Sequence, residues 1–323
     1  MVVSPVLQVC DLQVSFMMQK RAYPVLRELS YNLLPGRILA VVGESGSGKT
    51  VHALSLLGLL PPAAHVSRGK ILYRDTDLLT MPRARLRDVR GSKISMIFQD
   101  PSASLNPVLT VGEQLIETLR AHKPMSKQQA REEAVRLLEK VGIADAPARL
   151  SAYPFEFSGG MCQRVMIAMA LALSPDILIA DEPTTALDVT IQAQILHLIR
   201  ELQQKEKMAV IFITHNLALA SEIADEVLVL YGGLCMEQAP AKDLFEDPHH
   251  PYTKGLLASL VSMDRRVERL PAIAGQPPMA GEITKGCPFA SRCPQAQEKC
   301  RQQLPPLTQQ GIRMVRCFEE KTL

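Results

Sequence analysis

Two hydrophobic patterns alternate along the chain, and together they predict an α/β protein. Residues 6–16 alternate apolar and polar positions, as an edge-type strand does, and residues 26–34 predict a second strand. Residues 38–42 form a continuous apolar run, which is typical of a strand buried on both faces of a parallel sheet. Residues 50–60 then have the pattern of a helix that follows this strand.

The middle of the chain, from about residue 110 to 174, has a helical pattern. Apolar residues recur at helical spacing within residues 126–141, with charged residues between them, and Ser126 and Gln129 fit a capping box. Strands and helices then alternate over residues 177–180, 190–203, 209–214, 217–224 and 226–230. This order predicts an α/β core interrupted by a helical insert.

Composition narrows the class of protein. The chain has 323 residues, of which 47% are hydrophobic, and 36 basic against 33 acidic residues leave a net charge of +3. This balance gives no electrostatic basis for nucleic-acid binding, and the lack of Trp argues against base-stacking surfaces. No apolar run reaches the roughly 18 residues of a transmembrane helix, and no signal-peptide pattern opens the chain. We therefore expect a cytoplasmic protein that reaches a membrane only through a partner.

Residues 43–50 form a complete phosphate-binding motif, G-x-x-x-x-G-K-S/T, between a predicted strand and a predicted helix. Its members are Gly43, Glu44, Ser45, Gly46, Ser47, Gly48, Lys49 and Thr50. The glycines let the backbone wrap a phosphate chain without Cβ clashes. Lys49 is expected to reach the β- and γ-phosphates, and Thr50 is expected to bind Mg²⁺. A chance turn rich in Gly and Ser is the alternative, and the strand–loop–helix context argues against it.

An acidic pair follows a second apolar strand. Asp181 stands at the end of the run 177–180, where a carboxylate can orient Mg²⁺, and Glu182 comes directly after it. By itself this pair is equally compatible with a solvated turn. The phosphate-binding motif upstream makes a nucleotide site the better interpretation.

These motifs, in this order, resemble those of the ATP-binding subunits of ABC transporters. The match includes a signature loop that opens with Ser158, Gly159 and Gly160. The resemblance covers nearly the whole chain. It implies a RecA-like ATPase core with an antiparallel β subdomain and a helical subdomain inserted at about residues 100–174. It also implies a dimer, in which the signature loop of one subunit contacts the γ-phosphate of ATP held by its partner.

The same resemblance assigns roles to further residues. It implies that Glu182 polarises the attacking water as general base, and that Gln99 contacts Mg²⁺ or this water. His215 lies 33 residues after Glu182 and matches the switch histidine that contacts the γ-phosphate, whereas a lone His after a strand is usually structural. Phe16 stands where an adenine-stacking aromatic is expected. Tyr23 is a rival for that role, and Phe16 would equally suit the core.

The residues after about 246 differ in composition. Pro and Cys become more frequent and regular periodicity fades, which predicts an ATPase domain over residues 1–245 and a C-terminal module over residues 246–323. Segments 250–257 and 270–278 resemble the tail of the ATPases of oligopeptide and dipeptide importers, a group that also serves nickel, glutathione and related solutes. Within this group the chain is most similar to the first ATPase subunit of the dipeptide type.

Four of the seven cysteines gather in the tail. Cys287, Cys293, Cys300 and Cys317 have the spacing C-x5-C-x6-C-x16-C. Four thiolates can hold a 4Fe–4S cluster or a zinc ion, and the tight pairs common in zinc sites are missing here. The resemblance implies a 4Fe–4S cluster, because some members of the group bind one at these positions; zinc and no metal are the alternatives. Cys162, beside the signature glycines, is expected to be buried and inert.

The resemblance implies an ATPase subunit that powers the import of dipeptides or oligopeptides at the cytoplasmic face of the inner membrane. Its partners would be a second, homologous ATPase subunit, two transmembrane permease subunits and, through them, an extracytoplasmic solute-binding protein. Import of nickel, glutathione or another small solute is the alternative. A soluble ABC ATPase of DNA repair or translation fits less well, because the chain holds no sustained heptads between its motifs and carries one ATPase cassette. The presence of Lys49, Glu182 and His215 argues against a non-catalytic subunit.

Overall fold

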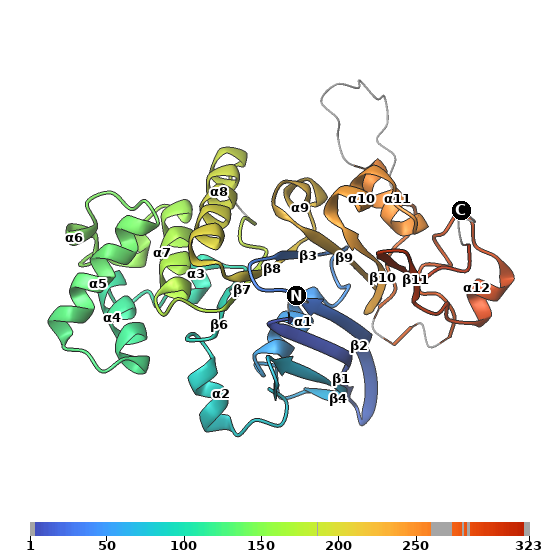
Figure 1. The fold of residues 1–323 in the computed structure, drawn as a ribbon, viewed down its shortest axis with the longest axis horizontal. Coiled ribbons are helices and arrows are strands. Elements are labelled where there is room, and N and C mark those ends of the chain that lie inside the picture. The colour runs from blue at the N-terminus through green and yellow to red at the C-terminus, as the bar shows by residue number, and fades with distance from the viewer. Residues whose placement is uncertain (1–3, 186, 260–272, 280, 283–284, 320–323) are drawn as a thin grey trace. The chain divides into compact units, whose positions relative to one another are not determined.

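The computed structural model describes residues 4–185, 187–259, 273–279, 281–282 and 285–319. The chain divides into two units, one made of residues 1–80 and 212–323 and the other of residues 81–211. Strand β8 (Ala209–Thr214) contains the second boundary between them. Each unit is described by itself below, and most of the elements are labelled in Figure 1.

The first unit contains an antiparallel sheet of four strands in the order β2-β1-β4-β5. Its strands are β1 (Leu7–Met18), β2 (Arg21–Leu33), β4 (Ala64–Tyr73) and β5 (Thr76–Asp77). The prediction of an edge strand at residues 6–16 was wrong in its position, because β1 lies between β2 and β4. The alternation of apolar and polar residues reports that one face of the sheet is exposed, and a central antiparallel strand shows this pattern as well as an edge strand does.

A second set of strands in the same unit carries the predicted buried strand. Strand β3 (Ile38–Val42), buried at every position, pairs in parallel with β9 (Glu226–Tyr231). Antiparallel pairing then continues outward from β9 through β10 (Leu234–Pro240) and β12 (Arg313–Val315) to β11 (Thr308–Gln310). The helices of this unit are α1 (Lys49–Leu56), α9 (Leu217–Ile223), α10 (Ala241–Glu246), α11 (Pro251–Ala258) and α12 (Glu298–Gln302).

Residues from the tail enter the hydrophobic core of the first unit. Tyr252 from α11 and Phe289 pack with Tyr231 at the end of β9, with ring centroids 4.5 to 5.4 Å apart. The same cluster includes Val42, the last residue of β3. The tail is therefore packed against the strand that leads into the phosphate-binding loop.

The second unit is mainly helical. Strands β6 (Ile94–Ile97) and β7 (Ile177–Asp181) form a parallel pair. Its helices are α2 (Arg83–Val89), α3 (Pro101–Ser104), α4 (Val111–His122), α5 (Lys127–Lys140), α6 (Ala146–Arg149), η1 (Pro154–Glu156), α7 (Gly159–Leu171) and α8 (Val189–Glu206). The capping box predicted for Ser126 and Gln129 is confirmed at the start of α5. This cap stabilises the helix that packs against α4 and α7.

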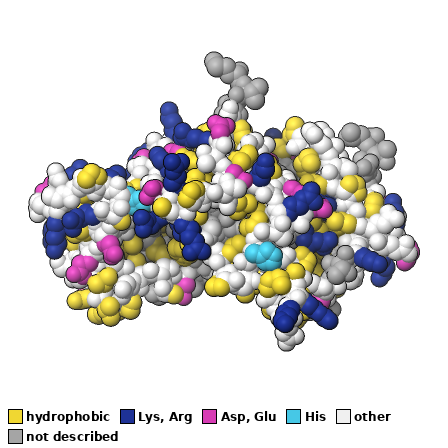
Figure 2. Space-filling view, turned by 90° about the horizontal axis from the view of Figure 1, so that it is seen from below, with side chains coloured by type: hydrophobic (Ala, Val, Ile, Leu, Met, Phe, Trp, Pro, Cys, Tyr) yellow, Lys and Arg dark blue, Asp and Glu magenta, His cyan; other side chains and the backbone are white. Residues whose placement is uncertain are grey.

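Two further features concern the charge of the surface and the suitability of the helices for a membrane. On the face shown in Figure 2, Lys and Arg side chains are interspersed with Asp and Glu. Among the helices of the described residues, none is both long enough and apolar enough to cross a lipid bilayer.

Candidate active site

The phosphate-binding motif forms a loop between β3 and α1, and the backbone conformation of its glycines explains the sequence. Gly43 has a φ of 155°, and a Cβ atom there would lie 2.1 Å from the carbonyl oxygen of Leu230. Gly48, at the N-cap of α1, has a φ of 104°, and a Cβ there would lie 2.8 Å from the Leu26 side chain. Any larger residue would push the loop away from β9 and β2, so these two positions require glycine.

The interior of this loop fits a chain of phosphate groups. The Lys49 ammonium group is buried and donates to the carbonyl oxygens of Gly43 (2.8 Å) and Glu44 (3.0 Å). The hydroxyl of Ser47 is buried and has no hydrogen-bond partner among the described residues. The N-cap residue of α1, Gly48, has no side chain that could bind the N–H groups of the first turn. Buried donors and an uncapped helix N-terminus are the features that bind phosphate.

The second unit brings two of the predicted catalytic residues together. Glu182 follows the last residue of β7, and its Oε2 atom accepts hydrogen bonds from Gln99 Nε2 (3.2 Å) and from Thr185 Oγ1 (2.9 Å). Gln99 comes shortly after β6, and β6 is paired in parallel with β7, so the carboxyl ends of both strands deliver these side chains to one place. Glu182 has a φ of 46°, a left-handed conformation that is rare for residues other than glycine and is concentrated at functional sites. Asp181, the last residue of β7, is buried.

The signature residues lie at the start of a long helix. Ser158 is the N-cap of α7, and its hydroxyl accepts a hydrogen bond from the backbone N–H of Met161 (3.3 Å). Ser158 and Gly159 are exposed, and Gly160 packs closely on Ile191 of α8. This arrangement leaves the first turn of α7 open to a ligand while its glycine holds two helices together.

Cys162 is buried, as predicted. Its thiol donates to the carbonyl oxygen of Pro154 (3.4 Å). Burial also raises the pKa of this thiol, which keeps it protonated and unreactive at neutral pH.

The remaining nucleotide residues belong to the first unit. His215 follows β8 directly and is exposed. Phe16 on β1 is half-buried and lies opposite Tyr23 of β2 in the strand register, so both candidates for adenine stacking point to the same face of the sheet. Their roles stay predictions.

The four cysteines of the tail do not form the predicted ligand set. Burial raises the pKa of Cys287 to about 11, and negative charge on Cys317, Cys300 and Cys293 would raise it further, so the four thiols lie within electrostatic reach of one another. Among the described residues, however, no three or more His, Cys, Asp or Glu side chains are placed to hold a metal ion. The side-chain positions therefore do not support the 4Fe–4S cluster.

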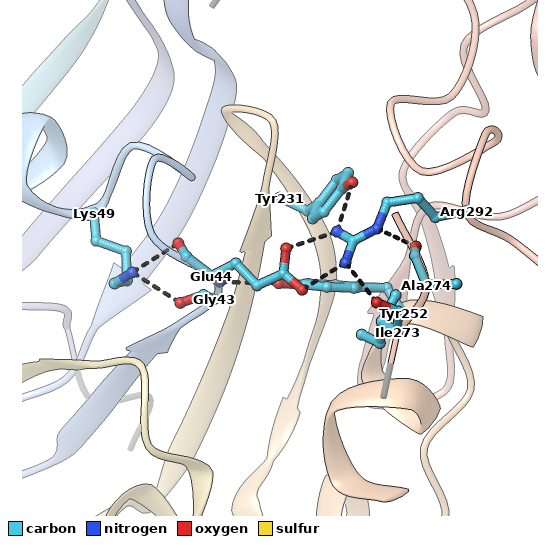
Figure 3. A network of polar contacts seen from close by, with 8 residues as sticks. All are labelled: Gly43, Glu44, Lys49, Tyr231, Tyr252, Ile273, Ala274 and Arg292. Atoms are coloured by element: carbon cyan, nitrogen blue, oxygen red, sulfur yellow. Dashed lines mark hydrogen bonds and ion pairs between the residues drawn. The ribbon is translucent and has the colours of Figure 1, made fainter. Parts of the chain in front are cut away.

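One set of residues around the phosphate-binding loop was not expected from the sequence. Figure 3 shows that Arg292 reaches the carboxylate of Glu44, with its two terminal nitrogens 2.6 and 3.1 Å from the two oxygens. The backbone N–H of Glu44 donates to the Tyr252 hydroxyl (2.9 Å). The available signal was the charge of Glu44 itself, because a carboxylate inside an anion-binding loop needs a cation beside it.

Comparison with family models gives two matches. The model described as "ABC transporter" matches residues 26–185. The model described as "Oligopeptide/dipeptide transporter, C-terminal region" matches residues 236–300. The second match includes Tyr252 and Arg292, the two tail residues that contact Glu44.

Close relatives carry peptide-transport names. The chain is 50% identical over 304 residues to the dipeptide transport ATP-binding protein DppD of Bacillus subtilis, which covers 94% of this chain and 91% of the relative. It is 48% identical over 301 residues to the oligopeptide transport ATP-binding protein OppD of Escherichia coli, covering 93% and 89%. Among solved structures, the dimeric ATP-binding cassette MJ0796 in a post-hydrolysis state with ADP and phosphate has a TM-score of 0.66 and 25% identity. It covers 73% of this chain and 98% of that one.

Proposed function

This chain belongs to the ATP-binding subunits of ABC transporters, in the family of oligopeptide and dipeptide importers, and we propose on this basis how its residues bind and hydrolyse ATP. It is the ATPase subunit of a peptide importer. The loop at residues 43–50 would cradle the phosphates, with the Lys49 ammonium group leaving the loop carbonyls for the β- and γ-phosphate oxygens. Mg²⁺ coordination is assigned to Thr50 and Asp181, with Gln99 as a further contact.

The hydrolytic step is assigned to Glu182. Its carboxylate would accept a proton from the water that attacks the γ-phosphorus, while the bond from that phosphorus to the bridging oxygen of ADP breaks. The observation that carries this proposal is the pair of hydrogen bonds from Gln99 and Thr185, because they fix the Glu182 carboxylate where the parallel strands β6 and β7 end. His215 would contact the γ-phosphate, and Phe16 or Tyr23 would stack on the adenine.

The signature residues are assigned to the nucleotide of a second ATPase subunit. Ser158 and Gly159 are exposed at the N-terminus of α7, which has 13 residues and no acidic side chain in its first turn. The Ser158 hydroxyl and the backbone N–H groups of the two glycines would stabilise negative charge on the γ-phosphate. This proposal makes both ATP sites depend on the dimer.

Our proposal extends to the partner subunits of this chain and to its location in the cell. We place the chain at the cytoplasmic face of the inner membrane, bound to two permease subunits and to a homologous second ATPase, with an extracytoplasmic solute-binding protein on the other side. Residues 246–323 are proposed as a module specific to this family, in support of which the matched C-terminal region lies at residues 236–300.

Peptide as the solute is tested in proteoliposomes that contain the complete transporter. We expect the binding protein loaded with alanyl-alanine to stimulate ATP hydrolysis above the basal rate, because transport couples the loaded receptor to closure of the ATPase dimer. Ni²⁺ and glutathione, each offered with the same binding protein, should leave the basal rate unchanged. Stimulation by either of these and not by the dipeptide would contradict the peptide assignment and favour the related importers.

We propose that the four tail cysteines bind a 4Fe–4S cluster, which would stabilise the tail and take no part in the ATPase reaction. It is supported by their spacing and by the mutual electrostatic influence of the thiols. Protein purified without oxygen is expected to contain about four iron and four sulfide per chain. The content should fall in Cys293→Ser and remain in Cys10→Ser, which changes an exposed thiol outside the set. Iron-free wild-type protein, or zinc in its place, would refute the cluster and leave the ATPase assignment untouched.

A further inference from the structure

Glu44, the second residue of the phosphate-binding loop, is held at two points by the tail. Its carboxylate binds the guanidinium of Arg292, and its backbone N–H binds the hydroxyl of Tyr252. Its carbonyl oxygen accepts from the ammonium group of Lys49. Glu44 therefore stands between the residue that would bind phosphate and two residues that lie 208 and 248 positions further along the chain (Figure 3).

Contacts with residues other than Glu44 also hold the Arg292 side chain in place. Only 5% of its side chain is exposed, against 24% for Glu44. Its remaining donors reach the Tyr231 hydroxyl (3.1 Å) and the carbonyl oxygens of Ala274 (2.9 Å) and Ile273 (3.3 Å). A planar guanidinium with this many partners presents a rigid two-point contact to a carboxylate, which a lysine would not reproduce.

Tyr252 is fixed by a separate set of contacts. The buried carboxylate of Glu237 accepts the backbone N–H groups of His249 (2.8 Å) and His250 (2.9 Å) and so sets the start of α11. Burial lowers the pKa of His250 to about 3, so its ring is neutral and Nδ1 accepts the backbone N–H of Tyr252 (3.0 Å). The Tyr252 ring is itself buried against Tyr231.

The charge of Glu44 gives these contacts a functional meaning. A phosphate chain bound in the loop carries negative charge, and an unpaired carboxylate on the same loop would repel it. Arg292 neutralises that carboxylate from the side that faces the tail. Tyr252 meanwhile fixes the backbone whose carbonyl oxygen positions Lys49.

We propose that Arg292 and Tyr252 are positioning residues for ATP binding: through Glu44 they neutralise and orient the phosphate-binding loop, so that the tail sets the affinity of the subunit for ATP. The proposal rests on the assignment of this loop to the phosphates of ATP. It gives the tail a role in nucleotide binding that does not depend on its cysteines.

The first test measures ATP binding to the full-length chain and the rate constants of the assembled transporter. Arg292→Ala is expected to raise the Kd for ATP about tenfold to hundredfold, as for loss of a charge-assisted contact to a buried group. KM should rise with it while kcat stays near the wild-type value. Adding Glu44→Gln to Arg292→Ala should restore most of the affinity, because it removes the unpaired charge. A matched control is Arg316→Ala, which removes a buried arginine of the tail that binds the carbonyl oxygens of Cys235 and Pro305 and pairs with Glu28.

A rescue of this kind separates electrostatic positioning from a merely structural role, since a packing defect would persist in the double variant. Unchanged affinity in Arg292→Ala, equal losses in Arg316→Ala, or no rescue by Glu44→Gln would each overturn the proposal. Failure of the wild-type chain itself to bind ATP would instead refute the assignment of the loop.

Tyrosine variants provide the second test and remain available if Arg292→Ala does not fold. Tyr252→Phe removes only the hydroxyl that accepts from the loop, and it should raise the Kd for ATP about threefold to tenfold. Tyr31→Phe removes another buried tyrosine hydroxyl of the same unit, one that binds His52 of α1 (2.7 Å), and it should have the smaller effect. Equal effects of the two substitutions would show that only packing is involved and would overturn the role of Tyr252.

Discussion

Replacing Glu182 by Gln is expected to lower ATP turnover of the assembled transporter by about 10² to 10⁴-fold, the range for loss of a general base. Glutamine keeps the size of the side chain and can still pair with Thr185, but it cannot take a proton from water. ATP binding should survive, because Glu182 holds no place in the phosphate-binding loop. ATP would then stay bound between two closed subunits, and the closed dimer should accumulate.

Turnover is measured as phosphate release, and closure by the size of the ATPase dimer in the presence of ATP. Glu201→Gln is the matched control, since it makes the same change on an exposed face of α8 in an ion pair with Lys205. Its turnover should stay within about twofold of wild type, as is usual for surface ion pairs. Hydrolysis at a near wild-type rate by Glu182→Gln would remove the general-base assignment.

Lys49→Ala is expected to abolish ATP binding and, with it, hydrolysis. The substitution removes the one side-chain charge of the loop that can meet the β- and γ-phosphates, and charge-assisted contacts to phosphate are among the strongest in proteins. It also frees the carbonyl oxygens of Gly43 and Glu44, which Lys49 now binds. The Kd for ATP should rise by at least about a hundredfold.

Binding is measured at equilibrium with a fluorescent ATP analogue. Lys140→Ala, which removes an ion pair with Glu206 on the other unit, serves as the control and should bind normally. The two variants differ in a diagnostic way, since Glu182→Gln binds without turning over and Lys49→Ala does neither. Unchanged affinity in Lys49→Ala would contradict the phosphate cradle.

The sequence predicted those parts of the fold that depend on local patterns. The apolar run at residues 38–42 correctly predicted β3, because a strand that is covered on both faces has apolar residues at every position. Ser126 and Gln129 gave the start of α5 because a capping box involves only neighbouring residues. The proximity of Gln99 and Glu182 is also explained by local sequence order, since each residue follows one of two strands that are parallel neighbours.

What could not be predicted depends on contacts between distant segments. The central position of β1 requires β4, which no pattern had indicated, and the pairing of β10 with β12 joins residues about 80 positions apart. Arg292 and Glu44 are 248 positions apart in the sequence, and no local pattern around either residue predicts their contact. For the cysteines, spacing records what four thiols could bind and not where their side chains lie, so the cluster stays a prediction.

The pairing of β3 with β9 has a consequence for synthesis on the ribosome. Leu39 pairs with Glu226, and Val42 with Val229, so the strand that supports the phosphate-binding loop lacks this parallel neighbour until most of the polypeptide has been translated. The ion pair between Arg292 and Glu44 forms later still, once Arg292 has left the exit tunnel. A nascent chain thus gains its competence to hold ATP near the end of translation, and ribosome-bound fragments that stop before residue 226 should not compete for the nucleotide.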